Sequence, residues 1–206
     1  MPSRVSLVIP VRDPASAKSR LAAGDDLAAQ QRRAALAAAI ALDTVTAARR
    51  AREVGEVIVV GVLASPIDGV LLLDDPGFGL LVAAGAGLAA ADPAAPTAVL
   101  LGDLPALQPA DLDAALVAAS EHHWAFVPDA GGSGTTLVTA AAGLPHALRF
   151  GVGSAEQHRD AGYVELDVPE RSGLRRDVDT PAQLAELAAL AAAGAVLLGP
   201  RTAALL

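Results

Sequence analysis

The stretch VSLVIPVRDP, residues 5–14, joins a continuous apolar run to a charged loop, and this pairing recurs along the chain. VIVVG at 57–61 and AVLLGD at 98–103 are further short apolar runs, with Ala- and Leu-rich segments of helical spacing between them. Continuous apolar runs are typical of strands that are covered on both faces, and their alternation with helices favours a parallel sheet. The sequence therefore predicts an α/β layer fold with a mostly parallel sheet.

Working outward from these runs, the same alternation continues toward the C-terminus. The expected strands are Val5–Pro10, Val57–Gly61, Val70–Leu73, Ala98–Leu101, Trp124–Val127, Thr136–Thr139 and Tyr163–Leu166. The expected helices are Leu27–Arg52, Leu80–Ala91, Pro109–Glu121, Ser154–Ala161 and Pro181–Ala193. No Ser/Gly linker or repeat period divides the chain, so we expect one domain over residues 1–206.

Composition excludes several classes of protein and site. Hydrophobic residues make up 53% of the chain and aromatic residues only 2%, so the core must be built mainly from Leu, Val, Ile and Ala. The net charge of −8 argues against a nucleic-acid partner, because binding to a phosphate backbone needs a basic face. Without cysteine the chain has no disulfide, thiol nucleophile or zinc–thiolate site.

The longest uncharged stretches are too short to span a membrane. Pro76–Ala91 has 16 residues and contains four glycines, and Leu187–Pro200 is shorter and interrupted by Gly194. A spanning helix needs about 20 apolar residues. The N-terminal segment reaches its first internal proline too soon for a signal peptide. We therefore expect a cytoplasmic protein without a membrane partner.

The segments that follow the strands are the places to look for chemistry, because ligands of open α/β sheets bind outside the carboxyl ends of the strands. After the first strand, Arg12, Lys18 and Arg20 lie among small residues, and Lys18 is the only lysine of the chain. Such a loop can approach a triphosphate and neutralise its charge. A solvated basic turn before a helix is the alternative interpretation.

Three carboxylates suggest a metal site. Asp103 comes directly after an apolar strand, where a carboxylate projects from the sheet edge and suits Mg²⁺. Asp177 and Asp179 alternate in an extended segment and so point to the same side. With the basic loop, they predict a site in which Mg²⁺ holds phosphates between acidic and basic walls. The alternatives are that Asp103 binds turn amides, and that Asp179 belongs to the helix cap predicted by Thr180 and Pro181.

Two glycine-rich segments lie farther along, Asp129–Thr136 (DAGGSGTT) and Phe150–Ser154 (FGVGS). Turns of this kind form nests of N–H groups that hold phosphate or carboxylate oxygens. Flexible hairpin turns have the same sequence, so both interpretations stay open.

Other polar residues carry weaker expectations. We expect Asp43 at an exposed helix position rather than in a buried contact with the phosphate loop. The four histidines lack metal-ligand spacing and are expected to be structural. The apolar tail Ala195–Leu206 is expected to pack on the domain or on a second copy.

Together these segments resemble the guanylyltransferases of deazaflavin coenzyme biosynthesis, which act on phosphoenolpyruvate or 2-phospho-L-lactate. The resemblance covers essentially the whole chain and rests on six motifs: VIPVR…AKSRL (8–21), GDLPAL (102–107), DAGGSGTTL (129–137), FGVGS…H (150–158), LRRDVDTP (174–181) and LGPRT (198–202). It implies a three-layer nucleotide-diphospho-sugar transferase-like fold and transfer of GMP from GTP to a phosphorylated carboxylic acid, with release of pyrophosphate. Phosphoenolpyruvate is the preferred acceptor, because the Ala- and Arg-rich composition is consistent with a GC-rich bacterial source.

The resemblance also implies roles for individual residues. It assigns Mg²⁺ to three carboxylates, Asp103, Asp177 and Asp179. It assigns the carboxylate and phosphate of the acceptor to Thr136, Gly151 and Ser154. It places the GTP phosphates against Arg12, Lys18 and Arg20, and it makes Lys18, Arg20 and Asp103 the catalytic residues.

The chain departs from this family on the nucleotide side. The family commonly has T-D-D after the second strand, where this chain has Gly61–Leu63, and G-L-N where this chain has Gly79–Leu81. These departures remove polar groups that read a guanine edge. Two alternatives follow: a nucleotidyltransferase with another base or acceptor, and a non-catalytic phosphometabolite-binding protein. Homodimer formation and hand-off of the product to the next transferase are left open.

Overall fold

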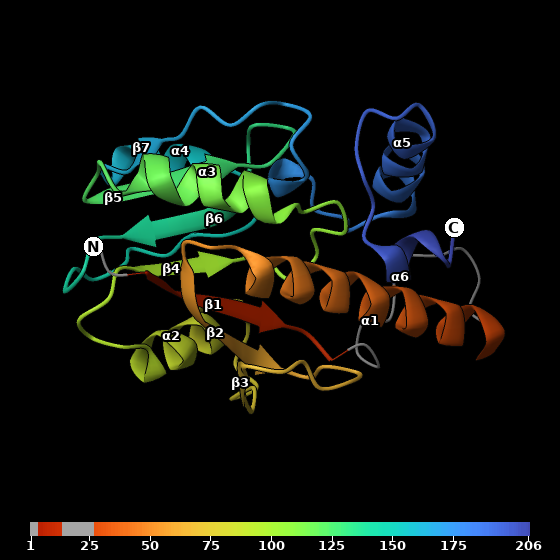
Figure 1. Ribbon diagram of the computed structural model, residues 1–206, viewed down its shortest axis with the longest axis horizontal. Coiled ribbons are helices and arrows are strands. Elements are labelled where there is room, and N and C mark those ends of the chain that lie inside the picture. The colour runs from red at the N-terminus through yellow and green to blue at the C-terminus, as the bar shows by residue number, and fades with distance from the viewer. Residues whose placement is uncertain (1–3, 14–26) are drawn as a thin grey trace.

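A central sheet lies between helices in the computed structural model, which describes residues 4–13 and 27–206 (Figure 1). Within these residues the sheet has seven strands in the order β3-β2-β1-β4-β6-β5-β7. The strands are β1 Val5–Val11, β2 Val54–Gly61, β3 Val70–Leu73, β4 Thr97–Leu100, β5 Trp124–Pro128, β6 Thr135–Ala140 and β7 Val164–Glu165. The helices are α1 Leu27–Arg50, α2 Leu80–Ala90, α3 Pro109–Ala119, α4 Ser154–Asp160, the short 3₁₀ helix η2 Gly173–Arg175, α5 Pro181–Ala192 and α6 Pro200–Ala203.

The sheet is mostly parallel, as the sequence predicts. β1 pairs in parallel with β2 and β4, β3 joins β2 in parallel, and β7 joins β5 in parallel. Only β6 runs the other way, between β4 and β5. The carboxyl ends of β1 and β4 therefore meet at one edge of the sheet, which is where a ligand site of this fold class belongs.

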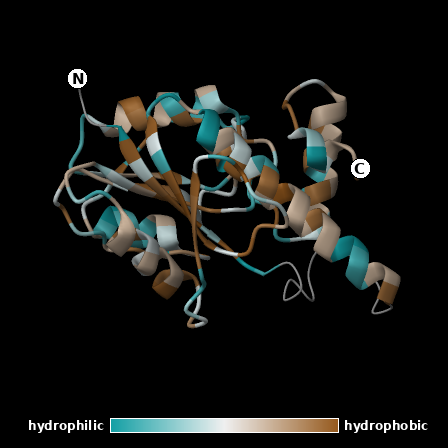
Figure 2. Cartoon of the chain, turned by 60° about the horizontal axis from the view of Figure 1, so that its bottom comes forward, coloured by the Kyte–Doolittle hydropathy of each residue, from teal (hydrophilic) through white to brown (hydrophobic). Residues whose placement is uncertain are grey.

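The alternating side chains of β1 fill two cores. Leu7 and Ile9 pack in one apolar cluster with residues of α1 and α3, whereas Val8 packs in a second cluster with residues of α2 and α4. Successive side chains of a strand point to opposite faces, so a strand that is apolar throughout must be covered on both sides. Figure 2 shows these hydrophobic strands at the centre of the molecule, enclosed by the helices.

A third apolar cluster joins the C-terminal part to α1. It contains Leu36 and Ile40 of α1, Leu187 of α5 and Val196 of the tail. Val196 of the tail thus packs on the same chain, whereas Leu197, Leu205 and Leu206 are exposed, and packing of the tail on a second copy stays a prediction. No helix among the described residues combines the length and apolar character that a bilayer crossing needs.

The observed bounds differ from the expected ones mainly at two places. β2 begins at Val54 rather than Val57, because Val54 and Glu56 pair with Val5 and Ser6 of β1 across a register shift that leaves Gly55 unpaired in this ladder. The tail contains the single-turn helix α6, which was not expected, since four residues give no periodic signal.

Candidate functional site

Arg12 and Asp103 follow β1 and β4, neighbouring parallel strands whose carboxyl ends share one edge of the sheet (Figure 1). Between β4 and α3 the chain forms a loop that is mostly buried from Leu104 to Leu107. The backbone carbonyl of Asp103 accepts a hydrogen bond of 3.0 Å from the N–H of Val178. This contact brings the segment with Asp177 and Asp179 beside the loop with Asp103, although more than 70 residues separate them in sequence.

Asp103 lies where an ionised carboxyl group is poorly stabilised. Its Oδ1 is buried and has no hydrogen-bond partner. Burial, together with the charges of Asp177 and Asp179, raises the pKa of Asp103 to about 8, and the charge of Arg12 opposes the shift. Mutual repulsion between these carboxyl groups shows that they share one electrostatic environment.

The pKa of Asp177 is raised by the same kinds of cause, but by less. Burial raises its pKa to about 6, with contributions from Asp129 and then Asp179. Asp179 is exposed, and its backbone N–H donates to Oε1 of Gln183 at 3.1 Å. Asp129 thus joins the group of acidic residues that the sequence singled out.

The donor set fits a hard divalent cation. A buried carboxylate oxygen without a partner, repelled by its neighbours, is the environment that a bound cation would relieve. Among residues 4–13 and 27–206, however, no three His, Cys, Asp or Glu side chains are arranged to hold a metal ion. Mg²⁺ commonly takes one or two carboxylates, with waters and substrate phosphates completing its shell, so a complete protein cage is not required.

Of the three basic residues that the sequence places at the site, the structure describes only Arg12. Arg12 is exposed and close enough to influence the charge of Asp103. Lys18 and Arg20, which the sequence assigns to the triphosphate, lie outside the described residues.

The glycine-rich segment after β5 is a hairpin turn organised by Asp129. The Asp129 carbonyl accepts from the N–H of Gly132 at 3.1 Å, and its Oδ1 accepts from the N–H of Ser133 at 3.0 Å. These two N–H groups are therefore committed inside the turn, which favours the hairpin interpretation over an open anion nest.

Of the three residues assigned to the acceptor, only Gly151 is exposed. Thr136 and Ser154 are fully buried. Gly151 and Gly153 have φ values of 89° and 80°, which favour glycine, and the N–H of Ser154 donates to the Gly151 carbonyl at 3.1 Å. Ser154 thus shapes this turn from below, and the exposed surface here is formed by the backbone of the turn.

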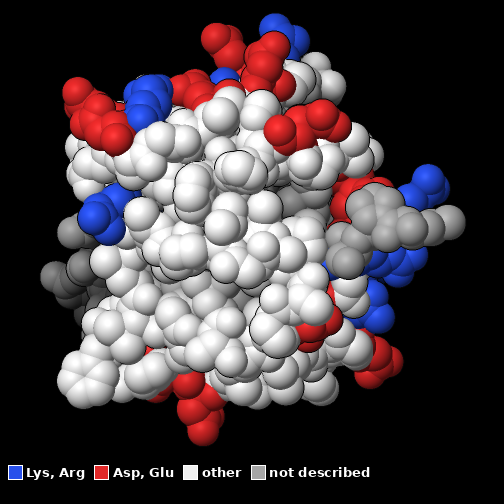
Figure 3. Space-filling model, turned by 90° about the vertical axis from the view of Figure 1, so that its left-hand side faces the viewer, with Lys and Arg blue, Asp and Glu red and all other residues white. Residues whose placement is uncertain are grey.

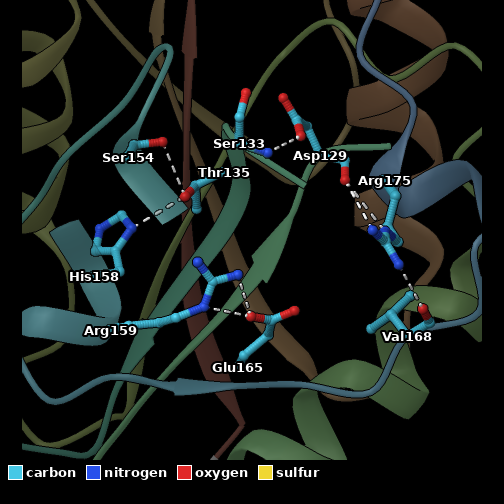
Figure 4. A network of polar contacts seen from close by, with 9 residues as sticks. All are labelled: Asp129, Ser133, Thr135, Ser154, His158, Arg159, Glu165, Val168 and Arg175. Carbon is cyan, nitrogen blue, oxygen red and sulfur yellow. Dashed lines mark hydrogen bonds and ion pairs between the residues drawn. The ribbon is translucent and has the colours of Figure 1, made fainter. Parts of the chain in front are cut away.

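Below the turn, a chain of hydrogen bonds connects Ser154, Thr135 and His158 (Figure 4). Ser154 Oγ lies 3.0 Å from Thr135 Oγ1, which lies 3.0 Å from His158 Nδ1. The N–H of Arg149 donates to His158 Nε2 at 3.3 Å, so a neutral ring carries its proton on Nδ1 and donates it to Thr135. Burial lowers the pKa of His158 to about 4, which keeps the ring neutral. His158 therefore has the structural role that the sequence predicts.

Arg175 connects the two halves of the site, a role that the sequence analysis missed. Its guanidinium donates to the Asp129 carbonyl at 3.0 and 3.3 Å and to the Val168 carbonyl at 3.2 Å (Figure 4). The hairpin turn after β5 is thereby fixed to the segment that leads into Asp177. Backbone carbonyl acceptors have no sequence signature, so only the doubled arginine of LRRDVDTP hinted at this contact.

The opposite end of the sheet, away from the carboxylates, has few charged side chains at its centre (Figure 3). Figure 3 shows the face at the left of Figure 1, where most charged side chains lie toward the margin and the centre is largely uncharged. A cavity of about 310 Å³ lies between the end of α2 and the segment after β6, lined in part by Leu88, Thr97 and His146. It shares no residue with the carboxylate group, so it is not part of this site.

Known proteins are similar to this chain over nearly its whole length. It is 44% identical to the phosphoenolpyruvate guanylyltransferase of Thermomonospora curvata over 97% of this chain and 87% of that protein. It is 43% identical to the phosphoenolpyruvate guanylyltransferase of Streptomyces coelicolor over 97% and 94% of the two chains. No protein-family model matches.

Solved structures agree on the fold. A nucleotidyl transferase from Methanothermobacter matches with a TM-score of 0.56 and 17% identity over 89% of this chain and 95% of that chain. Rv0371c of Mycobacterium tuberculosis, crystallised in complex with manganese, matches with a TM-score of 0.56 and 18% identity over 91% and 98% of the two chains. At these identities the likeness establishes the α/β fold alone.

Proposed function

Since the chain belongs to the family of phosphoenolpyruvate guanylyltransferases, we propose that it transfers GMP from GTP to the phosphate of phosphoenolpyruvate and releases pyrophosphate. The observation that carries the proposal is the grouping of Asp103, Asp177 and Asp179 at the carboxyl edge of the sheet, with a buried oxygen of Asp103 lacking a partner. A divalent cation and two phosphorylated molecules are what such a group is suited to bind.

The reaction requires little covalent chemistry from the protein. An oxygen of the acceptor phosphate attacks the α-phosphorus of GTP in line, and the bond from that phosphorus to the oxygen bridging the β-phosphate breaks. Pyrophosphate leaves with that oxygen. A phosphate dianion is already nucleophilic at neutral pH, so no general base is needed, and the residues act by positioning and by balancing charge.

Charge is the main obstacle to bringing the substrates together. Two unit negative charges at ~4 Å repel by about 4 kcal/mol at an effective dielectric near 20. Asp103 with Asp177 or Asp179 would hold Mg²⁺, with substrate phosphates completing its shell, and the bound ion would supply positive charge to the phosphates. Arg12, Lys18 and Arg20 would offset the remaining charge from the loop after β1.

Acceptor binding is assigned to the turn Gly151–Ser154 and to the end of the neighbouring β6 hairpin at Thr136. The exposed backbone at Gly151 supports contact with a small anionic acid. The buried Ser154 hydroxyl donates to Thr135 Oγ1 beneath this turn, and the buried Thr136 hydroxyl donates to the Val127 carbonyl of β5. The carboxylate and phosphate of phosphoenolpyruvate, 2-phospho-L-lactate and 3-phosphoglycerate are alike, so the acceptor must be chosen by experiment.

The test is incubation of the protein with GTP, Mg²⁺ and each of these three acids, with pyrophosphate release measured and products identified by mass. We expect a GMP adduct of phosphoenolpyruvate as the product. Asp103→Asn should lower turnover at least a hundredfold, which is the size of effect seen when one charge-stabilising group of an active site is removed. Near-normal Mg²⁺-dependent turnover of Asp103→Asn would contradict the assignment of this residue.

A second candidate, transfer from another nucleotide, has one observation in its favour. Val62 and Leu81 are apolar and 47% and 49% exposed, at the positions where the family commonly has polar residues. ATP, CTP and UTP in place of GTP test this candidate. Acceptor binding by calorimetry without pyrophosphate release from any nucleotide would instead identify a binding protein.

A further inference from the structure

Two adjacent polar residues in the middle of α1, Asp43 and Thr44, are both buried. Burial of polar groups is unfavourable unless they are hydrogen-bonded, so their partners indicate what they are there to hold. Asp43 was expected at an exposed helix position. That expectation is wrong, because its side chain is covered by the C-terminal segment of the chain.

Thr44 holds the loop that carries Asp103. Its Oγ1 accepts the N–H of Leu104 at 3.1 Å and donates to the carbonyl of Ile40 at 2.9 Å. Leu104 is the residue directly after Asp103 and is fully buried. Thr44 therefore fixes the backbone one residue away from the carboxyl group.

Asp43 holds the C-terminal turn. Its Oδ2 accepts the N–H of Thr202 at 2.7 Å, and its Oδ1 accepts the N–H and a guanidinium N–H of Arg201, each at 3.3 Å. This turn, residues 199–202, also contacts the loop that carries Asp103, because the N–H of Gly199 donates to the carbonyl of Pro105 at 2.7 Å. A side chain at Gly199 would overlap Asp43, so this close approach requires glycine.

Three consecutive residues of the loop are thus hydrogen-bonded to three separate parts of the chain. The Asp103 carbonyl binds Val178, the Leu104 N–H binds Thr44, and the Pro105 carbonyl binds Gly199. By contrast, Oδ1 of Asp103 has no partner. The backbone, rather than the carboxyl group, therefore determines where Asp103 lies.

We propose that Asp43 and Thr44 are positioning residues that, with the turn 199–202, hold Asp103 where it can bind a divalent cation. The inference rests on the proposed function of Asp103 as a metal ligand and goes beyond it by assigning a role to α1 and to the LGPRT segment. Sites of this kind must be held to within about 0.5 Å, and residues behind a ligand change metal affinity about 10- to 100-fold when altered.

The test compares three single-residue variants by direct binding of Mn²⁺, followed by electron paramagnetic resonance of the free ion. Thr44→Val keeps the shape but removes the acceptor for Leu104, and it should weaken Mn²⁺ binding at least tenfold. Thr44→Ser keeps the hydroxyl and should restore binding to within about twofold of the wild type. Thr139→Val is the matched control, because the buried Thr139 hydroxyl donates to the Ala125 carbonyl at 3.3 Å within the sheet, and Mn²⁺ binding should stay within about twofold of the wild type.

Asp43→Asn gives a second route to the same result if Thr44→Val does not fold. It leaves the helix intact and weakens the contacts with the turn, so Mn²⁺ binding should again fall. Thermal unfolding identifies a temperature at which every variant is folded, and binding is compared there.

Two results would overturn the inference, and they can be told apart. Wild-type Mn²⁺ affinity in Thr44→Val or in a folded Asp43→Asn would overturn the positioning role alone. Absence of Mn²⁺ binding by the wild type would overturn the metal site as well, since the loop would then have no cation to receive.

Discussion

At the scale of single residues, Arg175 connects the turn after β5 to the segment that carries Asp177. The planar guanidinium reaches two carbonyls at once, which the ammonium of a lysine cannot reproduce. Its neighbour Arg176 points elsewhere, toward the Glu170 carbonyl and the side chain of Glu186. The two adjacent arginines therefore offer a matched comparison.

We expect Arg175→Lys to raise the KM for phosphoenolpyruvate about tenfold, because the acceptor side loses its fixed relation to the carboxylates. Arg176→Lys should leave this KM within about twofold of the wild type, since the hydrogen bonds of Arg176 go to Glu170 and Glu186 and not to the turn after β5. Steady-state kinetics with phosphoenolpyruvate varied would check both. An equal effect of the two substitutions would refute the bridging role of Arg175.

At the scale of elements, the start of α5 is coupled to Asp179. Thr180 and Gln183 form a capping box in which Thr180 Oγ1 accepts the N–H of Gln183 and donates to its Oε1. The same Oε1 accepts the N–H of Asp179 at 3.1 Å. The helix cap predicted from Thr180 and Pro181 is confirmed, and it also holds the backbone beside an expected metal ligand.

Thr180→Ala should lower the free energy of unfolding by about 1 kcal/mol, the usual effect of removing a helix N-cap. It should also lower turnover, because Gln183 is no longer held against Asp179. Urea unfolding and pyrophosphate release measure the two effects. Thr180→Ser retains the cap and should match the wild type in both; turnover in Thr180→Ala equal to that of the wild type would separate the cap from the site.

The strands and longer helices could be predicted because their signals are local. Apolar periodicity located β1, β4 and the five longer helices within a few residues, and the strand ends indicated where Asp103 would lie. The pairing of Asp43 with Thr202 could not be predicted, because 159 residues separate them and a hydrogen bond from a backbone N–H to a carboxylate has no sequence signature. The antiparallel direction of β6 could not be predicted either, because an apolar run does not indicate which way a strand runs in the sheet.

At the scale of the whole molecule, the buried carboxyl groups predict how stability depends on pH. The pKa of Asp103 is raised to about 8 from 3.8, so the folded metal-free protein binds a proton that the unfolded chain releases. Its contribution to stability is present at low pH and is lost as pH rises toward 8. Below pH 6.5 this trend is opposed, because the pKa values of His146 and His158 are lowered to about 4.

Between about pH 6.5 and 8, Asp103 dominates this dependence, because Asp177, with its pKa raised to about 6, is already mostly ionised. Metal-free wild type should lose about 1 to 2 kcal/mol of unfolding free energy across this range, at up to 1.4 kcal/mol per pH unit. Asp103→Asn should flatten this slope, and added Mg²⁺ should stabilise the wild type increasingly toward pH 8. Urea unfolding with a chelator and with Mg²⁺ would measure both. An unchanged slope in Asp103→Asn would show that the carboxyl group does not cause it.

The hydrogen bonds from residues 199–202 to α1 and to the loop after β4 set an order of events during translation. The strands and the carboxylates precede residues 199–202 in the sequence, so they leave the ribosome before the turn that holds the loop of Asp103. A nascent chain whose strands have all emerged would therefore still lack a finished metal site until residues 199–202 have emerged as well.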